Sequence, residues 1–226
     1  MGGTAVMTDY QYQTILKSVK MILSGCKSIK EAQEKIDELI ITHFDKDHVG
    51  GAARLIEEFE VGEVYVTYQS KESKYIDAYY AALEEKSLQE TVVRDVLTYD
   101  TDACSVTIYP PERESYEKKQ RNNPSLVIRV RAFESSMLFA GDAEKLRIEE
   151  LVETEGLESD ILKMPHHGRP EKNTKELLEA IDPEYVIITS SDEEPEDEEV
   201  MELLAEDKRK TFMTREGEIV IHLDSS

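Results

Sequence analysis

A short apolar segment that runs directly into a dense group of potential metal ligands constrains this chain more than any other feature. Residues 37–42 (DELIIT) have the length and composition of a buried strand, and residues 43–51 (HFDKDHVGG) follow at once. Imidazole and carboxylate groups together suit zinc, manganese or iron. Because sites in α/β proteins are built where strands end, the segment predicts a metal site rather than a polar surface loop. The candidate ligands are His43, Asp45, Asp47 and His48.

The chain has five histidines, and a second pair occupies a similar position. His166 and His167 follow a predicted buried strand at residues 161–164. Asp142 follows another predicted strand, at the end of a hairpin over residues 126–133 and 136–140. The last histidine, His222, lies in the final predicted strand, and we interpret it as a surface residue.

Hydrophobic periodicity predicts mixed sheets covered by helices, in one domain over residues 1–226. Helices are predicted over residues 9–23, 47–59, 75–88, 143–154, 172–181 and 198–205. The other predicted strands are residues 61–68, 91–100, 105–109 and 185–190, with a closing hairpin of residues 211–214 and 218–223.

Charge and composition restrict the partners. The net charge of −22 repels polyanions, which argues against long nucleic acid as a partner. The sequence shows neither an apolar run of membrane-spanning length nor a signal-peptide pattern, so we expect no membrane contact. Cys26 and Cys104 are far apart and are interpreted as free thiols of a reducing compartment. These features together favour a cytoplasmic protein.

Three further segments share the order of a known family. Residues 123–127 (NPSLV), 138–144 (LFAGDAE) and 162–168 (LKMPHHG) accompany the H-x-D-x-D-H-x-G-G segment. Together they resemble the metallo-β-lactamase superfamily, and within it the branch of the hydrolase domain of competence DNA-uptake proteins (ComEC-like). The superfamily pattern is H-x-H-x-D-H, and here Asp45 replaces the second histidine. The resemblance implies an α+β fold, the four-layer αββα sandwich.

The resemblance also implies a binuclear hydrolase with two divalent metal ions, Zn²⁺ or Mn²⁺, that activate a water molecule. Asp142 is then the carboxylate that bridges the ions, and Asp47 orients the nucleophile as a catalytic residue. The other catalytic residue, His166, contacts the substrate or transfers a proton. The implied metal ligands are His43 and Asp45 for the first ion, Asp47, His48 and His167 for the second, and Asp142 for both.

Departures from the family pattern keep several functions open. Residues 49–165 contain no histidine, so the first metal would have an oxygen-rich ligand set that favours manganese. Residues 193–195 (EEP) stand where the branch often has Gly-His-Pro. The chain starts at Met1 as if after the first strands of the fold, so we expect these strands to be missing and the exposed sheet edge to support a homo-oligomer.

The leading function is hydrolysis of a small-molecule or short phosphodiester substrate. The first alternative is a carboxylic ester, lactone or β-lactam hydrolase, because the same fold supports all of these activities. The second alternative is a catalytically degenerate member that binds a metal or a partner protein.

Overall fold

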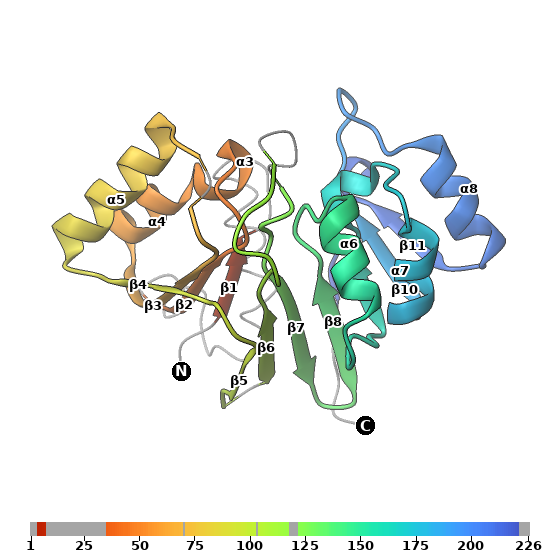
Figure 1. Ribbon diagram of the computed structural model, residues 1–226, viewed down its shortest axis with the longest axis horizontal. Coiled ribbons are helices and arrows are strands. Elements are labelled where there is room, and N and C mark those ends of the chain that lie inside the picture. Colours follow the sequence, from red (N-terminus) through yellow and green to blue (C-terminus); the bar gives the residue numbers. More distant parts are fainter. Residues whose placement is uncertain (1–3, 8–34, 70, 103, 118–121, 222–226) are drawn as a thin grey trace. The chain divides into compact units, whose positions relative to one another are not determined.

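The computed structural model describes residues 4–7, 35–69, 71–102, 104–117 and 122–221 (Figure 1). The chain divides into two compact units, Met1–Arg94 and Asp95–Ser226, and each is built on one β-sheet. The helix predicted over residues 9–23, Cys26 and His222 lie outside the described residues. The expectation of a single domain over the whole chain stays a prediction.

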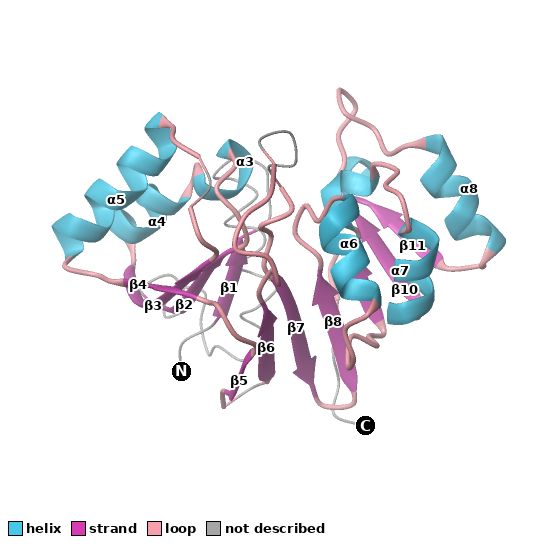
Figure 2. Cartoon of the chain, viewed as in Figure 1, coloured by secondary structure: helices cyan, strands magenta, loops and turns pink. Residues whose placement is uncertain are grey.

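The first unit contains a parallel sheet with the order β1-β2-β3-β4. Parallel neighbours need crossover connections, and helices provide them here between β2 and β3 and between β3 and β4. The helices α4 and α5 lie on one side of the sheet (Figure 2) and bury Leu55, Ile56 and Tyr79 against it. The elements are β1 (Thr4–Met7), β2 (Lys35–Ile41), α3 (Lys46–Val49), α4 (Ala52–Glu58), β3 (Glu60–Val66), α5 (Lys74–Lys86) and β4 (Glu90–Val92).

Two predicted elements of this region are wrong in extent. The single helix predicted over residues 47–59 is two helices, α3 and α4, that meet at Gly50 and Gly51, where glycine weakens helical continuity. The single strand predicted over residues 91–100 is two strands, β4 and β5 (Leu97–Asp100), which belong to different sheets. The strands separate because β4 pairs with β3 of the first unit, whereas β5 pairs with β6 of the second.

The second unit contains a seven-stranded mixed sheet with the order β11-β10-β9-β8-β7-β6-β5. Strands β5 to β8 pair in antiparallel fashion, and β8 to β11 pair in parallel. Apolar side chains of α6, α7 and α8 form one core with the sheet. The remaining elements are β6 (Ser105–Tyr109), β7 (Val127–Ala132), β8 (Ser135–Phe139), α6 (Lys145–Val152), β9 (Ile161–Lys163), η1 (Pro165–Gly168), α7 (Thr174–Ile181), β10 (Tyr185–Ile188), α8 (Glu198–Glu206), β11 (Lys210–Met213) and η2 (Thr214–Glu216).

The closing hairpin predicted from the sequence is also wrong. Strand β11 pairs in parallel with β10, because α8 provides the crossover between them. The short 3₁₀ helix η2 follows β11, and residues 218–221 form no strand. The other predicted helices and strands of the described residues are present within a few residues of their expected ends, and the α+β class is confirmed. Across the described part of the chain, no helix combines the length and apolarity needed to cross a membrane.

Candidate metal centre

Two histidines that follow β2 along the chain lie in the interior of the first unit. His43 is 1% exposed and His48 is fully buried, and their ring centroids lie 3.9 Å apart. The Thr42 hydroxyl oxygen lies 3.2 Å from His43 Nδ1 and 3.0 Å from His48 Nδ1. This oxygen has two lone pairs and can accept a hydrogen bond from each Nδ1–H. In that state both Nε2 atoms are unprotonated, which is the form that binds a metal ion.

The two aspartates of this segment have different surroundings. Asp45 caps the start of α3 and forms an ion pair with Lys71, whose side chain is mostly buried. Asp47 lies in the first turn of α3, is about half exposed, and places Oδ2 4.0 Å from His48 Nε2.

In the second unit, Asp142 and His167 come together at the carboxyl ends of two adjacent strands. Strands β8 and β9 are parallel neighbours, with Phe139 opposite Lys163, so the loops that follow them leave the same edge of the sheet. Asp142 is 3% exposed, and its Oδ2 lies 3.5 Å from His167 Nε2. The sequence predicted these two residues as ligands of one centre, and the structure places their ligand atoms side by side.

Thr189, at the end of β10, determines which nitrogen of His167 faces Asp142. The Thr189 carbonyl oxygen lies 2.9 Å from His167 Nδ1. Because a carbonyl can only accept, Nδ1 carries the proton, and Nε2 is the ring nitrogen that faces the Asp142 carboxylate. In the neutral form of the ring, the Nε2 lone pair and the carboxylate are suited to share a bound cation. Thr189 was not identified from the sequence, although it lies at the end of a predicted strand.

The loop that carries Asp142 is fixed by two residues from other segments, Ser125 and Lys163. Ser125 Oγ accepts a hydrogen bond of 3.2 Å from the Asp142 backbone N–H. The buried ammonium of Lys163 donates to the Gly141 carbonyl at 3.3 Å and lies 3.7 Å from Asp142 Oδ1. Gly141 has φ +57, and a Cβ there would come within 2.9 Å of Ser125 Cβ. The Asn-Pro-Ser and Gly-Asp motifs therefore pack directly against each other.

His166 and His167 both adopt left-handed backbone conformations, with φ values of 47° and 58°. Such backbone is uncommon for residues other than glycine and concentrates at functional sites. His166 contacts a different set of residues from His167. Its Nδ1 lies 3.4 Å from Glu171 Oε1, and its Nε2 lies 3.5 Å from Asn122 Nδ2. Glu144 and Glu171, which lie beside His166, were not identified from the sequence.

Burial has the largest effect on the pKa of Glu144, followed by the opposing effect of His166. Burial raises the pKa of the Glu144 carboxyl, and the neighbouring Glu171 and Asp142 raise it further. His166 and the backbone N–H of Asn122 act in the opposite direction and lower this pKa. The cluster therefore concentrates negative charge next to the loop that carries Asp142.

The sequence of this chain matches the model of a known superfamily. The family model described as Metallo-beta-lactamase superfamily matches residues 8–189, and the chain belongs to this superfamily of metal-dependent hydrolases. The chain is 28% identical over 162 residues to ComE operon protein 3 of Bacillus subtilis (strain 168), which covers 70% of this chain and 20% of that protein. It is also 26% identical over 158 residues to competence protein ComA of Neisseria gonorrhoeae, covering 69% of this chain and 20% of the relative.

These relatives confirm the predicted resemblance to the competence-protein branch. The chain spans about a fifth of their length. Among solved structures, Zn²⁺-bound PqqB from Methylobacterium extorquens matches with a TM-score of 0.54 at 11% identity, covering 96% of this chain and 83% of that one. At this identity the match shows the fold alone, and it confirms the predicted metallo-β-lactamase fold.

Proposed function

We propose that this chain hydrolyses phosphodiester bonds with two divalent cations, Zn²⁺ or Mn²⁺. The first unit supplies His43, Asp45, Asp47 and His48, which we call the first ligand set. The second unit supplies Asp142 and His167, which we call the second ligand set. The observation that carries the proposal is the 3.5 Å approach of Asp142 Oδ2 to His167 Nε2, with His167 Nδ1 held by the Thr189 carbonyl.

The residues of each set fit a metal ion in their donor chemistry. Buried imidazoles whose Nδ1 atoms are held by Thr42 or by the Thr189 carbonyl present Nε2 for binding, as in many metal sites. Bound divalent cations lower the pKa of water and polarise the oxygen of the bond under attack. In the proposed reaction, Asp47, which is half exposed beside His48, orients the attacking water.

Two observations support a small or short phosphodiester as the substrate. The relatives are competence proteins, and the sequence motifs resemble the hydrolase domain of their DNA-uptake branch. The net charge of −22 disfavours a long polyanion at the surface. His166 is proposed to contact the substrate or to transfer a proton to the leaving group.

One observation favours a second candidate, a member that binds metal without turnover. Asp45 is proposed as a ligand of the first ion, yet it forms an ion pair with Lys71. A lysine ammonium beside a carboxylate competes with a cation for the same oxygen atoms. In this candidate the first ion is weakly held and the chain binds a single cation or a partner protein.

The test combines metal content with hydrolysis. Full-length protein is loaded with Mn²⁺ or Zn²⁺, desalted and assayed by elemental mass spectrometry, and activity is measured on bis-(p-nitrophenyl) phosphate. We expect close to two ions per chain, and we expect Asp142→Asn to lower bound metal and activity together. Asp182→Asn is the matched control, because Asp182 is an exposed residue after α7 whose backbone conformation suits asparagine.

The other outcomes separate the candidates. Hydrolysis of lactone or β-lactam substrates without phosphodiester hydrolysis would support the carboxylic ester, lactone or β-lactam alternative. One ion per chain without turnover would support the metal-binding candidate. Full activity in Asp142→Asn with the metal content unchanged would refute the role of Asp142.

A further inference from the structure

We propose that Glu144, His166 and Glu171 form an additional divalent-cation site within the second unit, which we call the Glu-His-Glu site. One ligand atom from each residue lies within 4.8 Å of the others. Ligands about 2.0–2.6 Å from a shared ion lie no more than roughly 5 Å apart, so the spacing fits a single cation. The three residues come from separate segments: Glu144 precedes α6, His166 lies in η1, and Glu171 precedes α7.

Neutral donors hold both carboxylates in place. Asn123 Nδ2 donates to Glu144 Oε2 at 3.1 Å, and the Lys145 backbone N–H donates to Glu171 Oε2 at 3.1 Å. In Glu171 the other oxygen, Oε1, faces His166. Support of this kind, one oxygen anchored and the other directed at a common point, orients carboxylates in metal sites.

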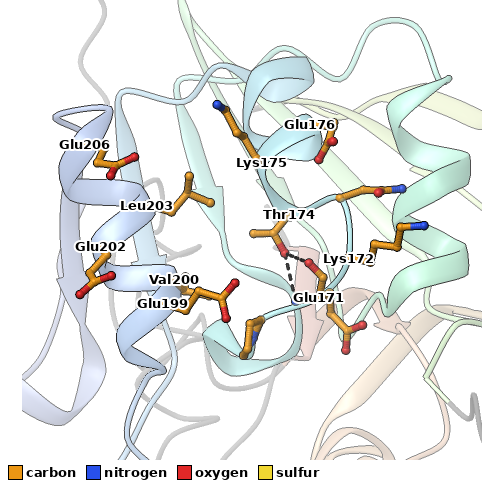
Figure 3. A pocket seen from close by; sticks show the side chains of 12 residues that line it. Glu171, Lys172, Thr174, Lys175, Glu176, Glu199, Val200, Glu202, Leu203 and Glu206 are labelled. Carbon is orange, nitrogen blue, oxygen red and sulfur yellow. Dashed lines mark hydrogen bonds between the residues drawn. The ribbon is translucent and has the colours of Figure 1, made fainter.

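The surroundings concentrate negative charge around the three residues. Glu171 lines a pocket of about 440 Å³ between the start of α7 and α8. Figure 3 shows this pocket with its labelled glutamates Glu171, Glu176, Glu199, Glu202 and Glu206. The pocket is lined by five glutamates and by two lysines, Lys172 and Lys175. Its side chains therefore have a net negative charge, which attracts cations toward the site.

The donor set indicates the type of ion. One imidazole and two carboxylates suit Mn²⁺ or Zn²⁺ better than Mg²⁺ or Ca²⁺, which prefer oxygen ligands alone. The three side chains are partly exposed, so water can complete the coordination. An ion in this site takes His166 as a ligand and places a positive charge next to the loop of Asp142. The site goes beyond the proposed function, because it uses neither ligand set. It does take His166, so with an ion bound there His166 no longer transfers a proton to the leaving group.

The test is a titration of the full-length protein with Mn²⁺, with free Mn²⁺ measured by electron paramagnetic resonance. We expect three bound equivalents in the parent protein and the loss of one in both Glu144→Gln and Glu171→Gln. Glu176→Gln is the matched control, since Glu176 lines the same pocket outside the Glu-His-Glu site, and it should keep three. Thermal unfolding without Mn²⁺ checks that each variant is folded, and glutamine preserves an acceptor for the anchoring donors.

The same titration separates this site from the proposed hydrolase centre. A single equivalent that Glu171→Gln removes and Asp142→Asn retains would keep the Glu-His-Glu site while refuting the binuclear centre. Two equivalents in the parent protein, with no loss in folded Glu144→Gln and Glu171→Gln, would overturn the Glu-His-Glu site.

Discussion

The two ligand sets are built in opposite ways. In the first unit, one continuous segment after β2 supplies every ligand, and the hydroxyl of the adjacent Thr42 contacts both histidines. In the second unit, Asp142 and His167 come from loops after two strands. The residues that fix them come from four further places: Ser125 before β7, Lys163 at the end of β9, Thr189 after β10 and Arg147 in α6.

The difference indicates which substitutions should disturb each ligand set. The first set depends on local geometry, so a single small change next to it should alter both histidines at once. The second set depends on the tertiary structure, so its weak points are buried side chains that never touch a ligand. Arg147 is such a residue, because its guanidinium donates to the Ser125 and Tyr109 carbonyls and pairs with Glu150.

The largest effect is expected for Arg147→Met. Arg147 is 1% exposed, and its loss leaves the buried Glu150 carboxylate with Tyr116, the Glu112 backbone N–H and the more exposed Arg113, so no buried cation among the described residues balances its charge. Breaking a buried pair by removing one partner costs about 3 kcal/mol of unfolding free energy. Urea denaturation measures this loss. The matched control is Arg54→Met, which breaks an exposed pair with Glu58 and should cost less than about 0.5 kcal/mol.

Equal stability of Arg147→Met and the parent protein would contradict the view that the second set rests on a distant buried framework. If the variant loses stability, its metal affinity should fall as well, because Ser125 holds the Asp142 backbone N–H.

The next effect is expected for Thr42→Val, which removes the hydroxyl that contacts both histidines. Residues that orient metal ligands typically contribute about 10- to 100-fold to metal affinity. Zn²⁺ affinity measured by chelator competition should fall by that factor, and nitrogen NMR of the metal-free protein should show a changed tautomer in His43 and His48. Thr42→Ser keeps the hydroxyl and should restore both properties.

Thr189→Val tests the corresponding residue of the second ligand set and is compared with Thr42→Val. His167 is held mainly by the Thr189 carbonyl, which the substitution retains. The loss of affinity should therefore be smaller than for Thr42→Val. A larger loss would show that both ligand sets depend on side-chain hydroxyls.

A smaller change of opposite sign is expected for Lys71→Met. This substitution removes the ammonium that pairs with Asp45 and frees the carboxylate for a cation. Metal affinity should rise by up to about tenfold, the scale of a partly screened charge interaction. Calorimetric titration with Mn²⁺ measures the change, with Lys74→Met at the start of α5 as the control. A decrease in affinity would show that Lys71 supports the first set.

The smallest effect is expected for Arg215→Gln at the surface of the second unit. Hydrogen bonds from Arg215 lower the pKa of Glu196 to about 2, from 4.5. A depressed carboxyl pKa stabilises the folded state above pH 4.5, and this stabilisation is lost as the pH falls toward 2. The parent protein should be slightly more stable than Arg215→Gln at pH 7. Unfolding curves at several pH values should converge near pH 2, and a constant difference would contradict the assignment.

The sequence by itself determined the local parts of the protein. The apolar strand before His43, the Gly-Asp and His-His-Gly motifs and the α+β class can be read from residues close together in the chain, because strand and helix periodicity are local properties. The family followed from the order of these motifs, and the family comparison confirms it. The helix start near residue 47 was also predicted to within one residue, whereas the division into α3 and α4 at Gly50 and Gly51 was not.

Only the tertiary structure decided which residues support the ligands. Lys71 beside Asp45 and Thr189 beside His167 are far from their partners in the chain. Sheet pairing brings the ends of β8, β9 and β10 to one edge, and it also divided the predicted strand 91–100 between two sheets. These contacts depend on strand order and register, which follow from packing across the whole fold rather than from any local pattern.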